Sequence, residues 1–247
     1  MSLYYEHKVR LAGMDVDGRG NCKASALLNH LQIAATLAAE EGGFSREVLM
    51  ERYGAFWMLA RSWYRLDRPL RWEEDITIRT WHRGAKTAMM YRDYDILADG
   101  VPVGESVSGW VLASVETRKL MRLSAIRELA GTGGGELCKT RTLSKLRCPE
   151  NLREVERRLM RYSDTDINGH VNNTRYADFA CDAVGLEGLP ADRFLSSMQI
   201  GYLAECRPGD RIAMETAETP EGAYVRGMDE SGKSRFEAAL FFGKVLP

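Results

Sequence analysis

The sequence predicts an α+β protein built from two similar units in tandem, each with a long central helix wrapped by an antiparallel sheet. Three observations support this fold class: a degenerate internal repeat, the same order of helical and strand periodicity in both halves, and a glycine-rich break shortly past the middle. Of the 247 residues, 45% are apolar and 28% are charged. The chain can therefore bury a substantial core.

The internal repeat is clearest at two places. The chain reads MDVDGRGN around Asp15 and SDTDINGH around Asp164, and a helical stretch follows each segment. The gapless segments 59–78 and 195–214 form the second match. The aligned pairs are Asp15 with Asp164, Asp17 with Asp166, Gly20 with Gly169, Asn21 with His170, Leu70 with Cys206, and Arg71 with Arg207. The second half alone thus carries a histidine at this point of the repeat.

Apolar residues at the i, i+3, i+4, i+7 spacing predict one helix with a single buried face in each half. They are Ala24, Leu27, Leu28, Leu31, Ala34, Ala35 and Ala38 in the first half, and Tyr176, Phe179, Ala180, Ala183 and Val184 in the second. Asn172 and Asn173 are good N-cap residues for the second helix. Its free N–H groups could then face an oxyanion.

Strand periodicity follows each helix. Alternating apolar residues in the second half are Met198, Ile200, Tyr202, Ile212, Met214, Ala223, Val225, Phe236, Ala238, Leu240 and Phe242. The first half offers Ile76 and Ile78, then the segments MMYRDYDIL and VPVGESVSGWVLASV. Residues 98–100 and 229–232 supply hairpin turns at equivalent places. Each half is therefore expected to form an antiparallel meander.

The glycine-rich stretch 131–135 suggests three parts: a first unit over residues 1–130, a linker over 131–150, and a second unit over 151–247. Residues 138–161 contain eight Lys or Arg and three Glu. This basic stretch is interpreted as a solvated linker with charged flanks. The functional alternative is a docking patch for an acidic carrier protein.

Composition excludes several classes of function. The net charge of −1 gives no global field for nucleic acid or an anionic membrane. The first residues are charged where an export signal needs an apolar core, and the apolar run 31–39 is too short to span a membrane. Five scattered cysteines without a C-x-x-C pair indicate reduced thiols in a cytoplasm. The four histidines show no ligand spacing, so no metal is expected. Nucleotide-binding glycine loops are absent from the sequence.

The segment Asp164-Thr-Asp-Ile-Asn-Gly-His-Val-Asn-Asn173 resembles the D-x-N-x-H-V-N-N signature of acyl-acyl carrier protein thioesterases. Glu205-Cys206, about thirty residues later, resembles the Glu-Cys pair of that family, and the likeness covers essentially the whole chain. The resemblance implies a tandem (double) hotdog protein that releases free fatty acids from acyl carrier protein without a cofactor. It implies that Asp166, Asn168, His170, Glu205 and Cys206 form the catalytic site. By the same resemblance, the first half would be non-catalytic and line the acyl-chain tunnel.

These residue types suit the hydrolysis of a thioester, which needs an activated water and a stabiliser for the developing oxyanion. Glu205 is predicted to be the general base, and His170 and Asn168 to hold the thioester carbonyl or the water. Asp166 would orient this set. One oxyanion donor is worth roughly 3–4 kcal/mol, so losing Asn168 or His170 should slow the reaction by about two to three orders of magnitude. The prediction requires the loop before the second helix to lie within a water's reach of Glu205.

Four alternatives stay open at this point. Cys206 could be a nucleophile assisted by His170 and Asn168, although the adjacent Glu205 disfavours a thiolate. The protein could instead be a hotdog hydrolase of coenzyme A esters, a hotdog dehydratase, or a non-catalytic acyl-binding module. A homodimer formed through sheet edges also stays open, since two copies in one chain could already satisfy that pairing.

Overall fold

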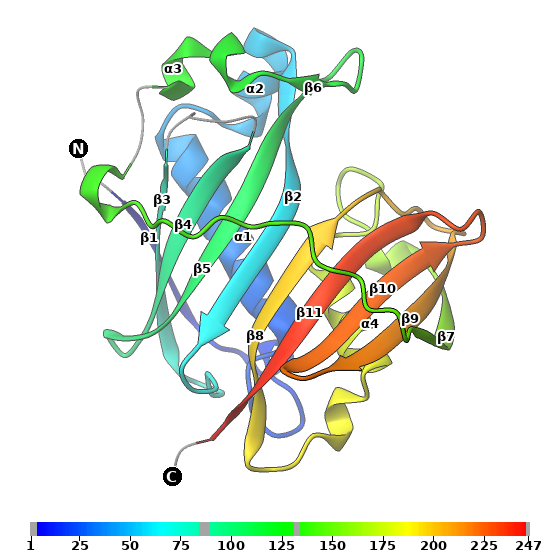
Figure 1. The fold of residues 1–247 in the computed structure, drawn as a ribbon. Helices are drawn as coiled ribbons and strands as arrows, with labels where there is room; N and C mark the ends of the chain where they lie inside the picture. Colours follow the sequence, from blue (N-terminus) through cyan, green and yellow to red (C-terminus); the bar gives the residue numbers. More distant parts are fainter. Residues whose placement is uncertain (1–3, 84–88, 131–133, 246–247) are drawn as a thin grey trace.

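The computed structural model describes residues 4–83, 89–130 and 134–245, and Figure 1 shows a strongly curved sheet with α1 (Ala24–Glu41) and α4 (Arg175–Ala183) on one face. The helices and strands in chain order are β1 (Tyr5–Arg10), α1 (Ala24–Glu41), α2 (Arg46–Tyr53), β2 (Ala55–Leu66), β3 (Asp75–His82), β4 (Met90–Ala98), β5 (Val101–Ser114), β6 (Leu120–Met121), α3 (Arg127–Ala130), β7 (Arg153–Leu159), α4 (Arg175–Ala183), β8 (Arg193–Tyr202), β9 (Arg211–Thr219), β10 (Gly222–Asp229) and β11 (Ser234–Lys244). The predicted α+β class is confirmed.

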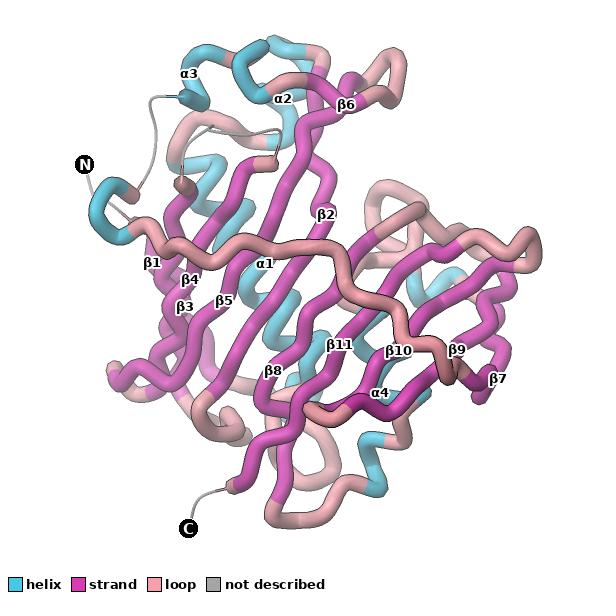
Figure 2. The backbone as a smooth tube through the Cα atoms, in the orientation of Figure 1, coloured by secondary structure: helices cyan, strands magenta, loops and turns pink. Residues whose placement is uncertain are grey.

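The eleven strands of the described residues belong to one antiparallel sheet, in the order β1-β3-β4-β5-β2-β8-β11-β10-β9-β7, with β6 paired to β5. Residues Arg61–Arg65 of β2 pair with Ser197–Gly201 of β8, and this short seam joins the two halves. Figure 2 shows α1 behind the strands of the first half and α4 behind those of the second. The two helices are therefore covered by one continuous sheet.

The two helices differ in length, which corrects the prediction of two long ones. Helix α1 has 18 residues, and its predicted face is buried except for the partly exposed Ala38. Helix α4 has only nine, because Gly185 in the left-handed region ends it. The predicted caps Asn172 and Asn173 are also wrong, since the N-cap is Thr174. The Asn172 Oδ1 instead accepts hydrogen bonds from the Thr174 backbone N–H (2.9 Å) and hydroxyl (2.8 Å).

The aligned segments that precede α1 and α4 fold in the same way. Asp15 Oδ2 accepts a hydrogen bond from the Ala12 N–H at 2.8 Å, and Asp164 Oδ2 accepts one from the Arg161 N–H at 2.9 Å. The paired glycines have φ angles of 74° at Gly20 and 73° at Gly169, which favour glycine in both turns. The predicted alignment of these segments is thus reproduced in three dimensions.

The predicted strands of the second half all form, but β1, β2, β6 and β7 were not predicted. Strand β7 has the sequence REVERRL, and none of its residues is fully buried. It lies at the end of the sheet order and pairs with β9 alone. A charged edge strand lacks the apolar alternation that marks a half-buried strand.

The connection between the halves crosses the outer face of the sheet, opposite the helices (Figure 1). The Leu143 side chain is buried against Trp63 and Val107, and the Arg141 guanidinium lies 3.8 Å from the centre of the Trp63 ring. Lys139 forms ion pairs with Asp95 at 2.7 Å and Glu105 at 2.8 Å. Most residues of 138–150 are exposed, as expected for a solvated linker, but Leu143 is buried and Arg141 and Lys139 contact the sheet.

Among the helices of the described residues, none has both the length and the apolar character needed to cross a bilayer.

Candidate active site

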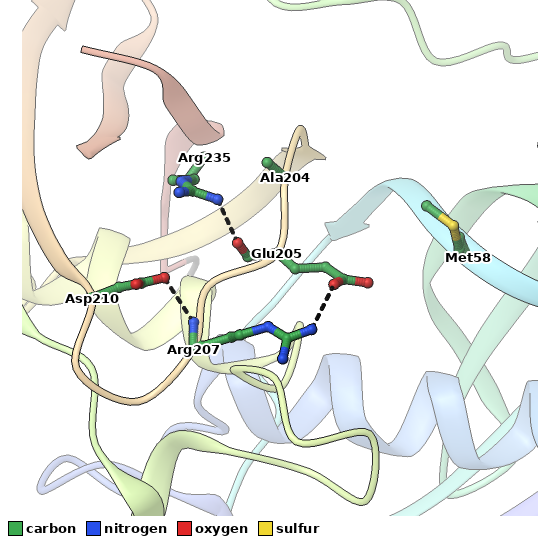
Figure 3. Close-up of a pocket in the computed structure, with 6 residues that line it drawn as sticks. All are labelled: Met58, Ala204, Glu205, Arg207, Asp210 and Arg235. Carbon is green, nitrogen blue, oxygen red and sulfur yellow. Dashed lines mark hydrogen bonds and ion pairs between the residues drawn. The ribbon is translucent and has the colours of Figure 1, made fainter. Parts of the chain in front are cut away.

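The site lies where β2 and β8 separate. Their pairing ends at Arg61 and Gly201, next to a bulge in β2 between Leu59 and Arg61. Beyond that point the chain after β8 turns away, which leaves a pocket of about 460 Å³. Figure 3 shows the Glu205 side chain extending from this loop toward Met58 of β2. The pocket is lined by Met58, Ala204, Glu205, Arg207, Asp210 and Arg235.

His170 and Glu205 form the central contact of the site. The His170 Nε2 lies 3.1 Å from the Glu205 Oε2, and the side chains are 17% and 48% exposed, respectively. A backbone hydrogen bond of 2.8 Å from the Val171 N–H to the Cys206 carbonyl holds the two loops together. The requirement that these loops lie within a water's reach is therefore met. The imidazole is sheltered, whereas the carboxylate remains open to a water or a substrate.

Arg207 places a positive charge beside this pair, and sequence reasoning did not include it among the site residues. Its guanidinium nitrogen lies 3.2 Å from the His170 Nε2 and 4.0 Å from the Glu205 Oε2. Its backbone N–H donates to the Asp210 Oδ2 at 2.9 Å, and Arg235 donates to the Glu205 carbonyl oxygen at 2.7 Å (Figure 3). The available signal was the repeat alignment, in which Arg71 and Arg207 are identical.

Asp166 and Asn168 lie in the same turn but make other contacts. The Asp166 Oδ1 accepts a hydrogen bond from the Asn168 N–H at 2.8 Å, and the Asp166 N–H donates to the His170 carbonyl at 3.0 Å. The Asn168 Oδ1 accepts from Arg46 of α2 at 3.2 Å. Within the described residues, neither side chain shows a hydrogen bond or ion pair to His170 or Glu205. Asp166 therefore shapes the turn that presents the imidazole, and Asn168 connects that turn to the first half.

Cys206 has a fully buried side chain. Burial raises the pKa of its thiol, and a hydrogen bond with Tyr176 lowers it by less. The thiolate is the nucleophilic form of cysteine, so this environment disfavours attack by Cys206. Its backbone carbonyl, by contrast, holds the histidine loop in place.

The equivalent position in the first half carries neither a histidine nor a glutamate. Asn21 stands where the second half has His170, and the gapless alignment places Pro69 opposite Glu205. Arg71 donates a hydrogen bond to the Asn21 Oδ1, as Arg207 contacts His170 in the second half. Both halves therefore share the arginine contact, whereas the first half has no imidazole or carboxylate at the aligned positions. Over the described ranges, no group of three or more His, Cys, Asp or Glu could hold a metal ion.

Solved structures share this fold over almost the whole chain. An acyl-ACP thioesterase from Bacteroides thetaiotaomicron superposes with a TM-score of 0.87 at 23% identity, covering 98% of both chains. A 12:0-ACP thioesterase from Umbellularia californica gives a TM-score of 0.81 at 19% identity, covering 99% of this chain and 98% of the other. These similarities show that the chain has the fold of those proteins.

Sequence relatives lead to the same group. The chain is 24% identical to an acyl-[acyl-carrier-protein] hydrolase from Cuphea viscosissima, over 89% of this chain and 56% of the relative. It is also 24% identical to oleoyl-acyl carrier protein thioesterase 1 from Arabidopsis thaliana, over 93% of this chain and 68% of the relative. The chain thus spans little more than half the length of the Cuphea protein.

Two family models cover most of the sequence. The acyl-ACP thioesterase N-terminal domain matches residues 2–127, and the acyl-ACP thioesterase C-terminal domain matches residues 150–240. The chain belongs to the acyl-ACP thioesterase family.

Proposed function

We propose that this protein hydrolyses the thioester of a fatty acyl group carried on acyl carrier protein, giving free fatty acid and the carrier thiol. The observation that carries the proposal is the 3.1 Å contact between His170 and Glu205 beside an open pocket. A carboxylate and an imidazole at this distance can share a water molecule and move its proton. Family membership and the names of the relatives support the same reaction.

In the proposed reaction, Glu205 takes a proton from a water whose oxygen attacks the thioester carbonyl carbon. The negative oxygen of the tetrahedral intermediate is stabilised by N–H donors and by the positive charge of Arg207. His170 supplies one donor, and the Asn168 Nδ2–H supplies another while its Oδ1 is held by Arg46. Collapse of the intermediate breaks the carbon–sulfur bond, and the leaving thiolate receives the proton.

Asp166 and Cys206 have indirect roles in this proposal. Asp166 orients His170 by closing the turn, and Cys206 anchors the histidine loop through its backbone carbonyl. The water mechanism is preferred to a cysteine nucleophile because the thiol is buried and its pKa is raised.

The proposal extends to the organisation of the chain. The matching turns before α1 and α4 support a tandem hotdog with units 1–130 and 151–247 joined by residues 131–150. The first unit would line the acyl chain, and acyl carrier protein would be the macromolecular partner. A cytoplasmic location and a homodimer stay predictions.

The test is a hydrolysis assay with acyl carrier protein and coenzyme A esters of graded chain length. Glu205→Gln and His170→Ala should each lower kcat by at least about 100-fold. Glu221→Gln, a control in the exposed β9–β10 turn, should leave the rate unchanged. Faster turnover of the coenzyme A esters would overturn the carrier-protein substrate. Binding of acyl carrier protein without release of fatty acid would show an acyl-binding module instead.

A further inference from the structure

The Nε2 atom of His170 lies within reach of two groups that make opposite demands on it. It is 3.1 Å from the Glu205 Oε2 and 3.2 Å from a guanidinium nitrogen of Arg207. A carboxylate accepts hydrogen bonds, whereas a guanidinium only donates them. In a neutral imidazole, Nε2 carries either a proton or a lone pair, so it can serve one of these neighbours and not both. The tautomer of His170 therefore decides which of the two contacts is a hydrogen bond.

The first half shows which contact this part of the fold builds. In each half, one backbone hydrogen bond of 2.8 Å joins the turn before the helix to the loop that carries the arginine: Cys22 to Leu70, and Val171 to Cys206. In the first half, Arg71 then donates to the Asn21 Oδ1, and Asn21 is aligned with His170. The arginine of the repeat thus faces a hydrogen-bond acceptor. The Nε2 of His170 is an acceptor only when its proton is on Nδ1.

The two neighbours of Nε2 also differ in their access to water. The Glu205 carboxylate is 48% exposed at the pocket, so water molecules can supply the hydrogen bonds that it accepts. The imidazole is only 17% exposed, so its Nε2 depends more on a donor from the protein. The backbone of Arg207 is fixed by Asp210 at 2.9 Å, and its guanidinium is a donor within reach. Before the reaction begins, Nε2 is therefore best satisfied as an acceptor for Arg207.

We propose that Arg207 is a positioning residue, which donates to Nε2 and so holds His170 as the tautomer with its proton on Nδ1. The inference rests on the proposed function and gives His170 a second task, the transfer of a proton. Once Glu205 has taken a proton from the attacking water, its O–H donates across the 3.1 Å contact and passes that proton to Nε2. The displaced guanidinium then donates to the negative oxygen of the tetrahedral intermediate.

This route returns every group to its starting state. The water oxygen has formed a bond to the carbonyl carbon, and its second proton stays with the product acid. The carbon–sulfur bond breaks, and the thiolate takes the proton from Nε2 of the imidazolium. The products are the free acid and the carrier thiol. Glu205 is again a carboxylate, and Arg207 can again donate to Nε2.

The test reads the tautomer directly, by nitrogen NMR of protein with isotope-labelled histidine in mildly alkaline buffer. The chain has four histidines, and His170→Ala identifies the signal of interest. In the wild type, Nε2 of His170 should carry no proton. In Arg207→Met it should carry one, which it donates to Glu205. Arg211→Met, which removes an exposed arginine at the start of β9, should keep the wild-type tautomer.

Turnover of an acyl ester of acyl carrier protein gives a second readout. Arg207→Met should lower kcat by about 100-fold, because the intermediate loses a donor and His170 no longer starts as a proton acceptor. The KM should stay within about threefold, since the interaction is made during the reaction and not on binding. Arg207→Lys keeps a positively charged donor and should recover about tenfold of the lost kcat. Arg211→Met should turn over at the wild-type rate.

The outcomes separate the two proposals. A proton on Nε2 of His170 in the wild type would overturn the inference and leave the hydrolase intact. An unchanged tautomer in a folded Arg207→Met variant would also overturn it. No hydrolysis by the wild type would overturn the proposed function and the proton route with it. If Arg207→Met does not fold, the wild-type spectrum decides by itself.

Discussion

The assignment of Glu205 as base, and of Cys206 as a buried structural residue, gives opposite expectations for two adjacent side chains. Glu205→Gln keeps the shape of the side chain but removes its ability to take a proton. Loss of a general base slows a reaction by about 10²–10⁴-fold, or roughly 3–5 kcal/mol of barrier. Cys206→Ala keeps the backbone carbonyl that holds Val171, so its rate should stay within about threefold of the wild type.

Cys206→Ala should instead lower the free energy of unfolding. Its side chain is fully buried, and the removed sulfur would leave a small cavity beside Tyr176. A loss of about 1–2 kcal/mol in the free energy of unfolding is expected, measured by urea denaturation. Turnover should be followed by mass spectrometry of the released fatty acid, because the exposed thiol of Cys148 would react with a thiol reagent.

One pattern of results would refute this reasoning. It is a folded Cys206→Ala variant without turnover, together with an acyl adduct on Cys206 in the wild-type protein under single-turnover conditions. The attacking atom would then be the Cys206 sulfur, and Glu205 would have to act as the base that deprotonates the thiol.

Three further predictions concern stability. Burial, and then Arg92, lowers the pKa of His82 to about 4, below the unfolded value of about 6.5. The free energy of unfolding should therefore fall between pH 6.5 and 4, by at most about 3 kcal/mol, and His82→Gln should flatten that slope in urea titrations. Gly227→Ala should cost about 1–3 kcal/mol in thermal unfolding, because its Cβ would lie 2.2 Å from the buried Phe236 ring; no loss would contradict that contact. Arg141→Ala should cost about 1 kcal/mol through its lost contact with Trp63, and equal stability of Arg141→Ala and the exposed Arg147→Ala would argue against it.

The sequence predicted the parts of the fold that depend on one local pattern. The α1 face and strands β8 to β11 have clear apolar periodicity, so their existence follows from helix and strand geometry. The edge strand β7 was not predicted, because its charged residues show no alternation of apolar and polar side chains. The length of α4 depends on the left-handed Gly185, and a single glycine does not show where a helix ends.

The candidate site was predictable to a similar extent. The family motif named His170 and Glu205, which the fold brings to 3.1 Å. The contacts of Arg46 and Arg207 depend on how distant segments fold together, which local sequence does not report.

The seam between β2 and β8 has a consequence for how the protein behaves in solution. If each half were a separate copy of one single-unit chain, the two copies would have to associate. Any substitution in the gene would then appear in both copies. Here the two halves are encoded separately, so Asn21 and Pro69 stand in the first half at the positions aligned with His170 and Glu205. The tether also keeps the halves paired at any dilution. If the proposed activity holds, turnover per molecule should therefore not decline as the protein is diluted, unlike that of an assembly whose site is completed by a dissociating subunit.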